Sequence, residues 1–397
     1  MPMNRRRFVQ LSASGLGIAM TSACGIAPTL RVSRTLTVWT TQYIVDDILA
    51  RWRRLNPEHT ITRVPVAAEQ FTQRLHAAFA GTEALPDVVI TTSDIIAQFS
   101  QRGMWHALND RQFPVTQLAP SSVVQCQTED TRLLALPLAV NPIGIWYRSD
   151  ILAHAGLPQQ PDTVHAQISD DWQRFAAFGL QIHNNLPEVA WIADAMSDLF
   201  QPLTRTTLSL PDAARIAFQA RAQFADFAAS RDSGAWFDLL QRDRVAMVVA
   251  GSWMQASLAR TTRQGEFPWR VIAPPTGCIA GESVAIAVTE AANQRDVALQ
   301  LMQDLVFDSE SQLMLHESQQ LIPALMQTYT TAQFQRMDTF CAGQKVGQLW
   351  THAAQTMTGQ PLSARWVQRN TEAIATVAAA LAGNITHGDA LRQLTNG

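Results

Sequence analysis

The chain of 397 residues is poor in cysteine and tyrosine and has a single lysine, Lys345. Of its four cysteines, only Cys126, Cys278 and Cys341 follow the N-terminal segment. An odd number at wide spacings excludes a disulfide-dense scaffold and leaves room for one bridge, whose pair the sequence does not choose. Eleven tryptophans against three tyrosines stand out, because flat indoles suit both cores and sugar faces.

Recognisable catalytic and metal-binding motifs are also absent. The sequence has no Gly-x-Ser-x-Gly elbow, no phosphate-cradling glycine loop and no paired-cysteine motif. Residues 316–320, beginning His316-Glu317, approach a zinc-hydrolase helix but lack the second histidine one turn later. The acidic pairs at 46–47 and 170–171 resemble helix starts. We therefore predict no catalytic residue, no metal and no cofactor.

Charge of one sign is not concentrated anywhere along the chain. The formal net charge is -3, and loss of the only early basic residues, Arg5, Arg6 and Arg7, takes it to -6 with no basic cluster left. A protein that binds nucleic acid needs a positive patch, so we expect no nucleic-acid partner.

Long hydrophobic runs are missing too, and the apolar run near the N-terminus is short. The segment from Phe8 to Met20 has thirteen residues, includes Gly and Ser, and follows Arg5, Arg6 and Arg7. It is too short to span a bilayer and is typical of an export signal. The arginines resemble a twin-arginine signal, and the small residues before Cys24 resemble a lipobox, with Thr21 where Leu is usual.

Two alternatives stay open for this segment: a basic N-terminus with a chance cysteine, or a secretory signal cut elsewhere. Residues 1–24 are predicted to be the signal, with Cys24 lipidated and residues 25–34 as a tether. Several acyl chains at Cys24 anchor stably, whereas one does not. We expect an extracytoplasmic protein, in the periplasm or at the cell surface, held to a membrane through this lipid.

The mature chain is long enough for two lobes. About 370 residues exceed what one hydrophobic core usually supports, and 47% of the residues are hydrophobic. Hydrophobic periodicity predicts strand, helix, strand, helix, strand over residues 36–39, 44–55, 60–66, 71–79 and 87–90. This βαβαβ order indicates a parallel sheet covered by helices.

Ligands of such sheets bind beyond the carboxyl ends of the strands, here the loops 40–42 and 91–94. Ser93 or Asp94 is expected to cap the helix that follows. The second half is mainly helical by period, with no internal repeat. Helices are predicted at 212–229, 291–307 and 371–382, and strands at 245–249, 270–273 and 284–288.

Four landmarks in order, residues 85–89, 136–158, 244–253 and 383–391, resemble those of the solute-binding proteins of ATP-driven sugar importers. The likeness is to family 1, the maltose-binding-protein-like branch, and covers nearly the whole mature chain. It implies a two-lobed periplasmic-binding-protein-like α/β fold (class II), with the ligand in a cleft between lobes.

The predicted N-terminal lobe is 36–138 plus 281–320, and the C-terminal lobe is 142–272 plus 324–397. The resemblance further implies hinge closure around a carbohydrate and delivery to the permease subunits of an ABC transporter. We expect a monomer without enzymatic activity.

Site residues carried over by the resemblance begin with Asp94, Asn141 and Trp253. Asp94 would accept from sugar hydroxyls, since a carboxylate can accept from two neighbours, although helix capping is the alternative. Asn141 replaces a ligand-binding acid of the maltose branch, which puts maltose itself in doubt. Trp253 matches a tryptophan that stacks on a pyranose, with core packing as the alternative.

Further candidates are Trp39, Thr41, Gln42 and Glu282. Trp39 points either into the core or into the cleft, whereas Thr41 and Gln42 are better hydrogen-bonding candidates. Glu282 stands where the family has an aromatic residue, so it either alters ligand choice or is solvated. The other residues considered are Tyr147 of the crossing strand, Trp146 with the opposite facing, and Trp191, Asp194, Trp350 and Trp366 for the second lobe.

Two rival functions remain open from sequence alone. One is an exported enzyme of the cell envelope, which twin-arginine export often serves. The other is a sensor or adhesion lipoprotein that kept the binding fold.

Overall fold

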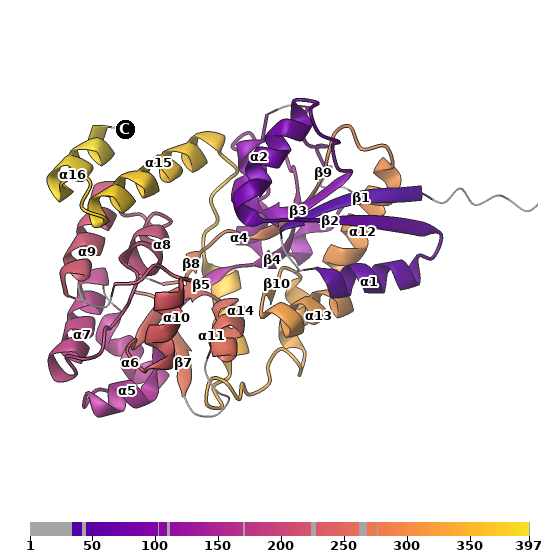
Figure 1. Cartoon of the computed structure of the whole chain (residues 1–397). Coiled ribbons are helices and arrows are strands. Elements are labelled where there is room, and N and C mark those ends of the chain that lie inside the picture. Colours follow the sequence, from indigo (N-terminus) through magenta and orange to yellow (C-terminus); the bar gives the residue numbers. More distant parts are fainter. Residues whose placement is uncertain are drawn as a thin grey trace, which may run out of the picture.

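The computed structural model shows two α/β lobes joined at their centre (Figure 1). Each lobe is built on its own sheet, one of six strands and one of four. The structure describes residues 34–41, 45–101, 103–108, 112–169, 171–223, 228–261, 268–275 and 277–396. The predicted signal, Cys24 and the tether lie outside these residues, as does Gln42.

The sheet of the first lobe has the order β10-β4-β9-β3-β1-β2. The parallel βαβαβ unit is confirmed, because β1 pairs in parallel with both β2 and β3. The whole sheet is mixed, since β9 is antiparallel to β3 and β4, and β10 is antiparallel to β4. Of these two strands, β9 enters from the second lobe after β8, whereas β10 follows α13 of the first lobe. The strands are β1 (Arg34–Thr41), β2 (His59–Val66), β3 (Val88–Thr92), β4 (Leu136–Val140), β9 (Val284–Val288) and β10 (Ile322–Pro323).

Helices cover both sides of this sheet, with α2 on one side and α1, α12 and α13 on the other (Figure 1). The α1 helix begins at the predicted acidic pair, Asp46 and Asp47, whose charges favour a helix N-terminus. The helical elements of this lobe are α1 (Asp46–Leu55), α2 (Ala68–Phe79), α3 (Ser93–Gln98), η1 (Val115–Gln117), α4 (Pro120–Val124), α12 (Arg295–Phe307), α13 (Ser309–Gln319) and η4 (Met326–Thr330).

The second sheet is centred on β5, which pairs with β6, β7 and β8, all antiparallel. Its strands are β5 (Pro142–Arg148), β6 (Met247–Gly251), β7 (Trp269–Ile272) and β8 (Ile279–Ala280). Trp146 and Tyr147 are fully buried on opposite faces of β5, as the strand alternation predicts. The Tyr147 hydroxyl donates to the Gln159 carbonyl at 2.8 Å, so this tyrosine is a core residue.

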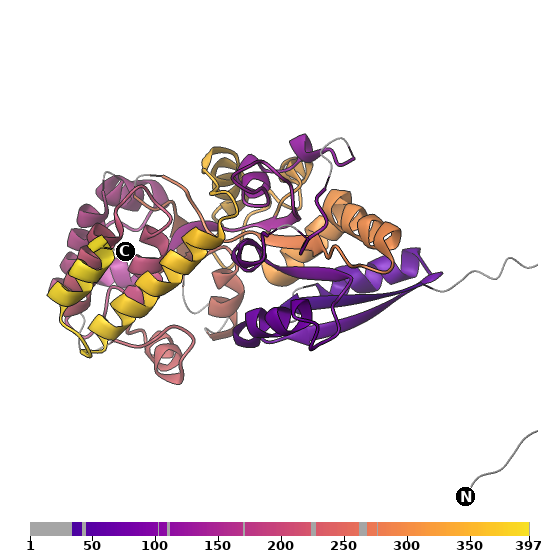
Figure 2. The same ribbon diagram turned by 90° about the horizontal axis from the view of Figure 1, so that it is seen from above.

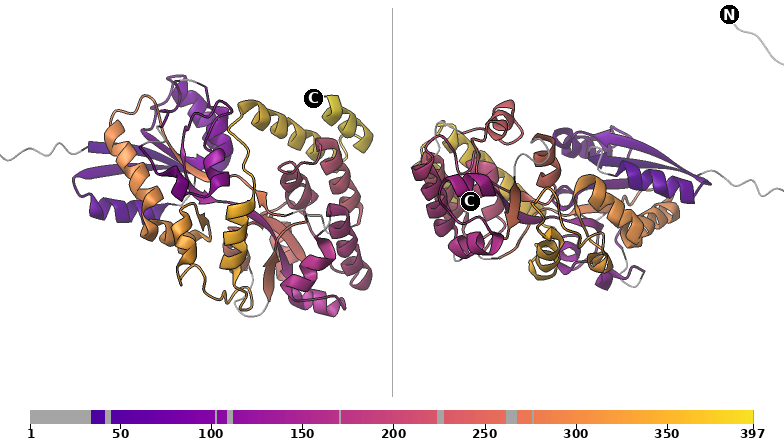
Figure 3. Two further views of the ribbon diagram at one scale, coloured as in Figure 1. Left: turned by 180° about the vertical axis from the view of Figure 1, so that it is seen from behind. Right: turned by 90° about the horizontal axis from the view of Figure 1, so that it is seen from below.

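Helices of the second lobe surround this sheet, and the C-terminal helices α15 and α16 pack on α9 (Figure 3). The α14 helix instead contacts both α4 of the first lobe and β5 of the second. The bounds are α5 (Ser149–His154), α6 (Pro161–Ile168), α7 (Trp172–Asn185), η2 (Met196–Phe200), α8 (Gln201–Leu203), α9 (Leu210–Gln223), α10 (Gly234–Gln241), α11 (Met254–Thr261), α14 (Val346–Thr356), α15 (Ala364–Leu381) and α16 (His387–Asn396).

Two crossing segments connect the sheets. β4 continues into β5 through Asn141, and β8 continues into β9 through residues 281–283. The Gly281 amide donates to the Asn141 carbonyl at 2.8 Å, and the Gln125 side chain donates to the Gly281 carbonyl at 2.9 Å. The crossing segments therefore touch each other, and a side chain of the first lobe holds one of them.

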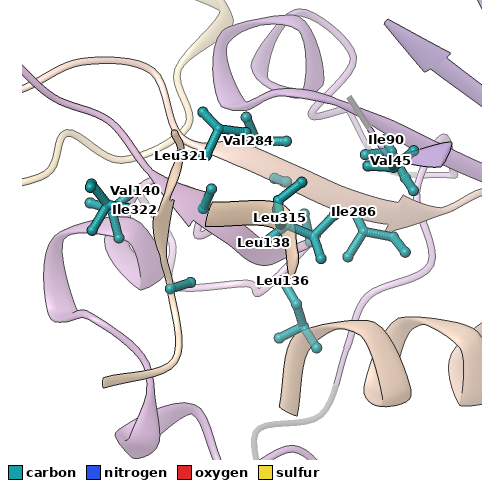
Figure 4. Packing of buried hydrophobic residues seen from close by; sticks show 14 of the residues in the cluster. Val45, Ile90, Leu136, Leu138, Val140, Val284, Ile286, Leu315, Leu321 and Ile322 are labelled. Carbon is teal, nitrogen blue, oxygen red and sulfur yellow. The ribbon is translucent and has the colours of Figure 1, made fainter. Parts of the chain in front are cut away.

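Apolar packing is dense in the first lobe, where β4 and β9 meet α13 (Figure 4). It continues across the junction, because Trp146 of β5 lies 6.0 Å from Trp350 of α14, ring centre to ring centre. Gly144 is required there: a Cβ at this position would lie 2.8 Å from a Val271 methyl and 2.9 Å from the Trp350 ring. Trp350 is therefore a junction core residue.

Cys126, Cys278 and Cys341 are all free thiols, so the one bridge that the sequence left possible is not formed. The Nδ1 atom of His316 lies 2.8 Å from the Leu321 carbonyl, consistent with a structural histidine. Across the described ranges, no helix combines the length and apolarity needed to cross a membrane.

Candidate functional site

A cavity of about 200 Å³ lies at the crossing segments, against the second lobe. Three predicted ligand residues, Asn141, Trp253 and Glu282, line it together. Both crossing segments and the end of β6 contribute to its wall. Its other lining residues are Ile143, Ser197, Gln201, Pro202, Arg205, Arg231, Val249, Ala250, Gly251, Gly281, Asn370 and Ile374.

Asn141 is wedged between two glycines. A Cβ on Gly251 would lie 1.8 Å from Asn141 Oδ1 and 2.8 Å from Trp253 Nε1, and one on Gly281 would lie 2.6 Å from Asn141 Nδ2. Only glycine leaves room for the amide at this place. Asn141 Oδ1 is buried without a hydrogen-bond partner, and its residue lines the cavity.

We expect Gly251→Ala to abolish or strongly weaken ligand binding, because the added methyl displaces Asn141 or Trp253. Overpacking of this kind costs about 1–3 kcal/mol of stability. The matched control is Gly234→Ala, where a Cβ meets nothing within 4 Å. Calorimetric titration and thermal unfolding of both variants check this, and an unchanged affinity in Gly251→Ala would contradict it.

Asp94 forms an ion pair across the two lobes. Arg205, which follows α8, places Nη2 at 2.5 Å from Asp94 Oδ2 and at 3.2 Å from Glu282 Oε1. The Arg205 side chain is 9% exposed and that of Asp94 is 20% exposed. The Arg205 guanidinium also lies 5.0 Å from the centre of the Trp366 ring. This arginine of the second lobe therefore contacts both Asp94 of the first lobe and Glu282 of a crossing segment.

The predicted cap of α3 is not formed. Thr92 is the residue at the N-cap position and no side chain bonds there, while Asp94 bonds to Arg205 instead. Ser93 Oγ is buried without a partner. The competing charge of Arg205, which the local sequence does not reveal, decides the role of Asp94.

The pKa of Asp94 is raised to about 7, first by burial and then by the nearby Glu282 charge, against the opposing effect of Arg205. The folded state then binds more protons than the unfolded state between about pH 4 and 7. The free energy of unfolding should therefore fall as pH rises through this window, by at most about 1.4 kcal/mol per pH unit, and level off above it.

The Asp94→Asn variant should lack this part of the pH dependence. Urea unfolding of both proteins at half-unit steps from pH 5 to 8 measures their free energies of unfolding. Subtracting one curve from the other removes the contributions of titrating groups that the two proteins share. Parallel curves over the whole range would show that Asp94 titrates normally.

A buried polar network supports the cavity wall in the second lobe. Asp198 is fully buried and accepts from Arg231 Nη2 at 2.6 Å and from the Val249 amide at 2.9 Å. Asp194 accepts from the Arg231 amide at 2.7 Å. Burial, with a smaller contribution from Asp194, raises the pKa of Asp198 to about 6, while Arg231 opposes this. The network fixes Arg231, Ser197 and β6 beside the cavity.

Other predicted residues lie away from this cavity. Trp39 is 3% exposed, packs edge-on to Phe71 and lies under Arg74, so the structure places it in the first-lobe core. Thr41 is buried at the end of β1, opposite Val66 of β2. Neither lines the cavity, because β1 ends on the far side of β3 from the crossing segments.

The remaining candidate tryptophans differ in their burial and surroundings. Trp191 is fully buried, pressed against Gly179, and Trp350 belongs to the junction core. Trp366 of α15 is half-buried beside Arg205. Sequence reasoning missed Arg205 and Arg231, since isolated arginines in a chain with many arginines carry no motif.

A family model of bacterial extracellular solute-binding proteins matches residues 55–340. The chain belongs to this family. No curated protein matches the sequence of this solute-binding protein significantly.

Solved structures with the same two-lobed fold cover nearly the whole solute-binding protein. One is an extracellular solute-binding protein of family 1, with a TM-score of 0.79 and 17% identity over 91% of this chain and 98% of the other. The GacH receptor of Streptomyces glaucescens, solved unliganded and with acarbose, has a TM-score of 0.72 and 16% identity over 92% and 97%.

A third is an ABC transporter associated binding protein from B. animalis subsp. lactis, solved with β-1,6-galactobiose. It has a TM-score of 0.73 and 16% identity over 92% of this chain and 96% of the other. At identities of 16–17%, the similarity to these structures establishes the fold alone.

Proposed function

We propose that this protein captures a carbohydrate between its lobes and delivers it to the permease of an ABC transporter. The observation that carries the proposal is the cavity at the lobe junction, where an indole, an unpartnered amide oxygen and a carboxylate converge. An indole suits the C–H face of a sugar, and the other two groups suit its hydroxyls. Structural neighbours solved with acarbose and β-1,6-galactobiose support the ligand class.

Binding would favour the closed arrangement of the lobes by its differential affinity for that state. The two crossing segments at Asn141 and residues 281–283 are the natural hinge, because they are short and join lobes with separate sheets. Recognition of the closed pair of lobe surfaces by the permease follows from the family and is part of the proposal. The division at 36–138 plus 281–320 and 142–272 plus 324–397 also stays a prediction.

We further propose that the protein is a lipoprotein, exported through its twin-arginine signal and anchored through Cys24. The supporting features are the N-terminal arginines, the thirteen-residue apolar run and the small residues before the cysteine. Mass spectrometry of membrane-extracted protein, compared with Cys24→Ser, tests the anchor. Equal partition of both proteins into the soluble fraction would refute it.

Thermal unfolding of the body from residue 34 onward, against hexoses, oligosaccharides, polyols, amino acids and metal ions, tests the ligand class. A ligand at about 100 times its dissociation constant stabilises by roughly 2.7 kcal/mol, which raises the midpoint by several degrees. A shift confined to sugars supports capture of carbohydrate. A shift confined to metal ions or amino acids, or hydrolysis of a panel sugar, would contradict the proposal.

A further inference from the structure

Arg205 of the second lobe reaches across to the first lobe and lines the cavity at the lobe junction. It bridges Asp94 of α3 and Glu282 of the crossing segment, and its guanidinium lies over the Trp366 ring. It is the second-lobe partner of both carboxylates, at the place where α15 contacts α3 (Figure 2). The guanidinium engages one oxygen of each carboxylate, so each carboxylate has fewer acceptor positions left for a ligand.

Arg205 also lies between two hollows, an inner cavity and an outer groove. The inner one is the cavity of about 200 Å³ that Arg205 lines. The outer one is a groove of about 560 Å³ lined by Thr204, Thr206, Trp366 and Asn370, among others. Asn370 belongs to both linings, so the two hollows lie next to each other at this residue. The residues on either side of Arg205 face the outer groove, while Arg205 itself faces the inner cavity.

Size limits what the inner cavity accepts. The cavity of about 200 Å³ is smaller than the roughly 300–1,000 Å³ of pockets that take drug-sized ligands, so its size suits one small ligand such as a single sugar ring. Toward the outer groove, a second sugar ring would have to pass Arg205.

We propose that Arg205 sets the length of the ligand. Its side chain fills part of the cleft, ties the two lobes together without ligand, and confines the ligand to a single sugar ring. The part of this inference that concerns ligand length rests on the proposed carbohydrate function, whereas the tie between the lobes does not. Neutralising the tie detaches α3 from the second lobe and opens the inner cavity to the outer groove.

The test compares wild type with Arg205→Ala by calorimetric titration with glucose, galactose and mannose and with maltose, lactose and trehalose. Wild type should bind one monosaccharide at least tenfold more tightly than any disaccharide containing it. Arg205→Ala should reduce or reverse this preference by at least tenfold. Arg215→Ala is the matched control, since Arg215 is an exposed arginine paired with Asp212 on α9. A disaccharide preferred by wild type, or a preference unchanged in Arg205→Ala, would overturn the proposal.

Small-angle X-ray scattering without ligand gives a readout that needs no sugar. The radius of gyration should increase in Arg205→Ala and in Asp94→Asn, which cuts the same tie from the first lobe, and stay unchanged in Arg215→Ala. If no sugar binds any variant but both expand, the carbohydrate proposal fails and the tie stands. If circular dichroism shows folded proteins and neither variant expands, the tie is refuted whatever the sugars do.

Discussion

Asp198→Ala is expected to lower the free energy of unfolding by about 3–5 kcal/mol, the largest stability effect anticipated for one substitution here. The change leaves Arg231, whose side chain is 11% exposed, without its 2.6 Å partner. It also removes the acceptor of the Val249 amide on β6. Loss of one member of a buried pair costs more than the pair contributes, since the remaining charge stays desolvated.

Asp212→Ala is the matched control. Its partner Arg215 lies one helical turn away, and both side chains are 52% exposed. An exposed pair of this kind contributes less than about 1 kcal/mol. Urea unfolding followed by circular dichroism compares the two variants. A cost below about 1 kcal/mol for Asp198→Ala would show that Arg231 finds water or another acceptor.

Trp253→Ala is expected to weaken ligand binding at least a hundredfold, which corresponds to about 2.7 kcal/mol. The indole is half-buried in the cavity wall, beside Gly251 and Asn141, and supplies its flat apolar surface. Removing it takes away stacking area and lets water into the cavity.

The conservative variant Trp253→Phe separates stacking from mere packing. Phenylalanine keeps a flat face, so it should recover most of the affinity that alanine loses. Titration of wild type and both variants with the sugar that gives the largest thermal shift measures this. Equal affinity in all three would remove Trp253 from the ligand site.

Much of the first lobe could be predicted from sequence. Strands β1, β2 and β3 and helices α1 and α2 follow from short-range hydrophobic periodicity, which depends on neighbours in the chain. The family resemblance placed 281–320 in this lobe, but the antiparallel insertion of β9 between β3 and β4 did not follow from local patterns, because it pairs residues 145 to 200 positions apart. Local patterns carry no information about such a return.

The candidate site could likewise be predicted only in part. Asn141, Trp253 and Glu282 were predicted, and the structure brings all three to one cavity. Trp39 was offered as a ligand residue, and its burial beside Phe71 places it in the core. The difference arises because a strand-end tryptophan has two possible facings, and only the helices that pack on the sheet choose between them.

By itself, the sequence determined the α/β class through hydrophobic patterns that are contiguous in the chain, and the two-lobe expectation through its length, while the crossing at Asn141 was implied by the family resemblance. Only the tertiary structure decided that Asp94 pairs with Arg205 rather than capping α3. It also decided that Gly251 and Gly281 must be glycine. The physical reason is that charge pairing and steric exclusion act through space, between residues that the chain order keeps apart.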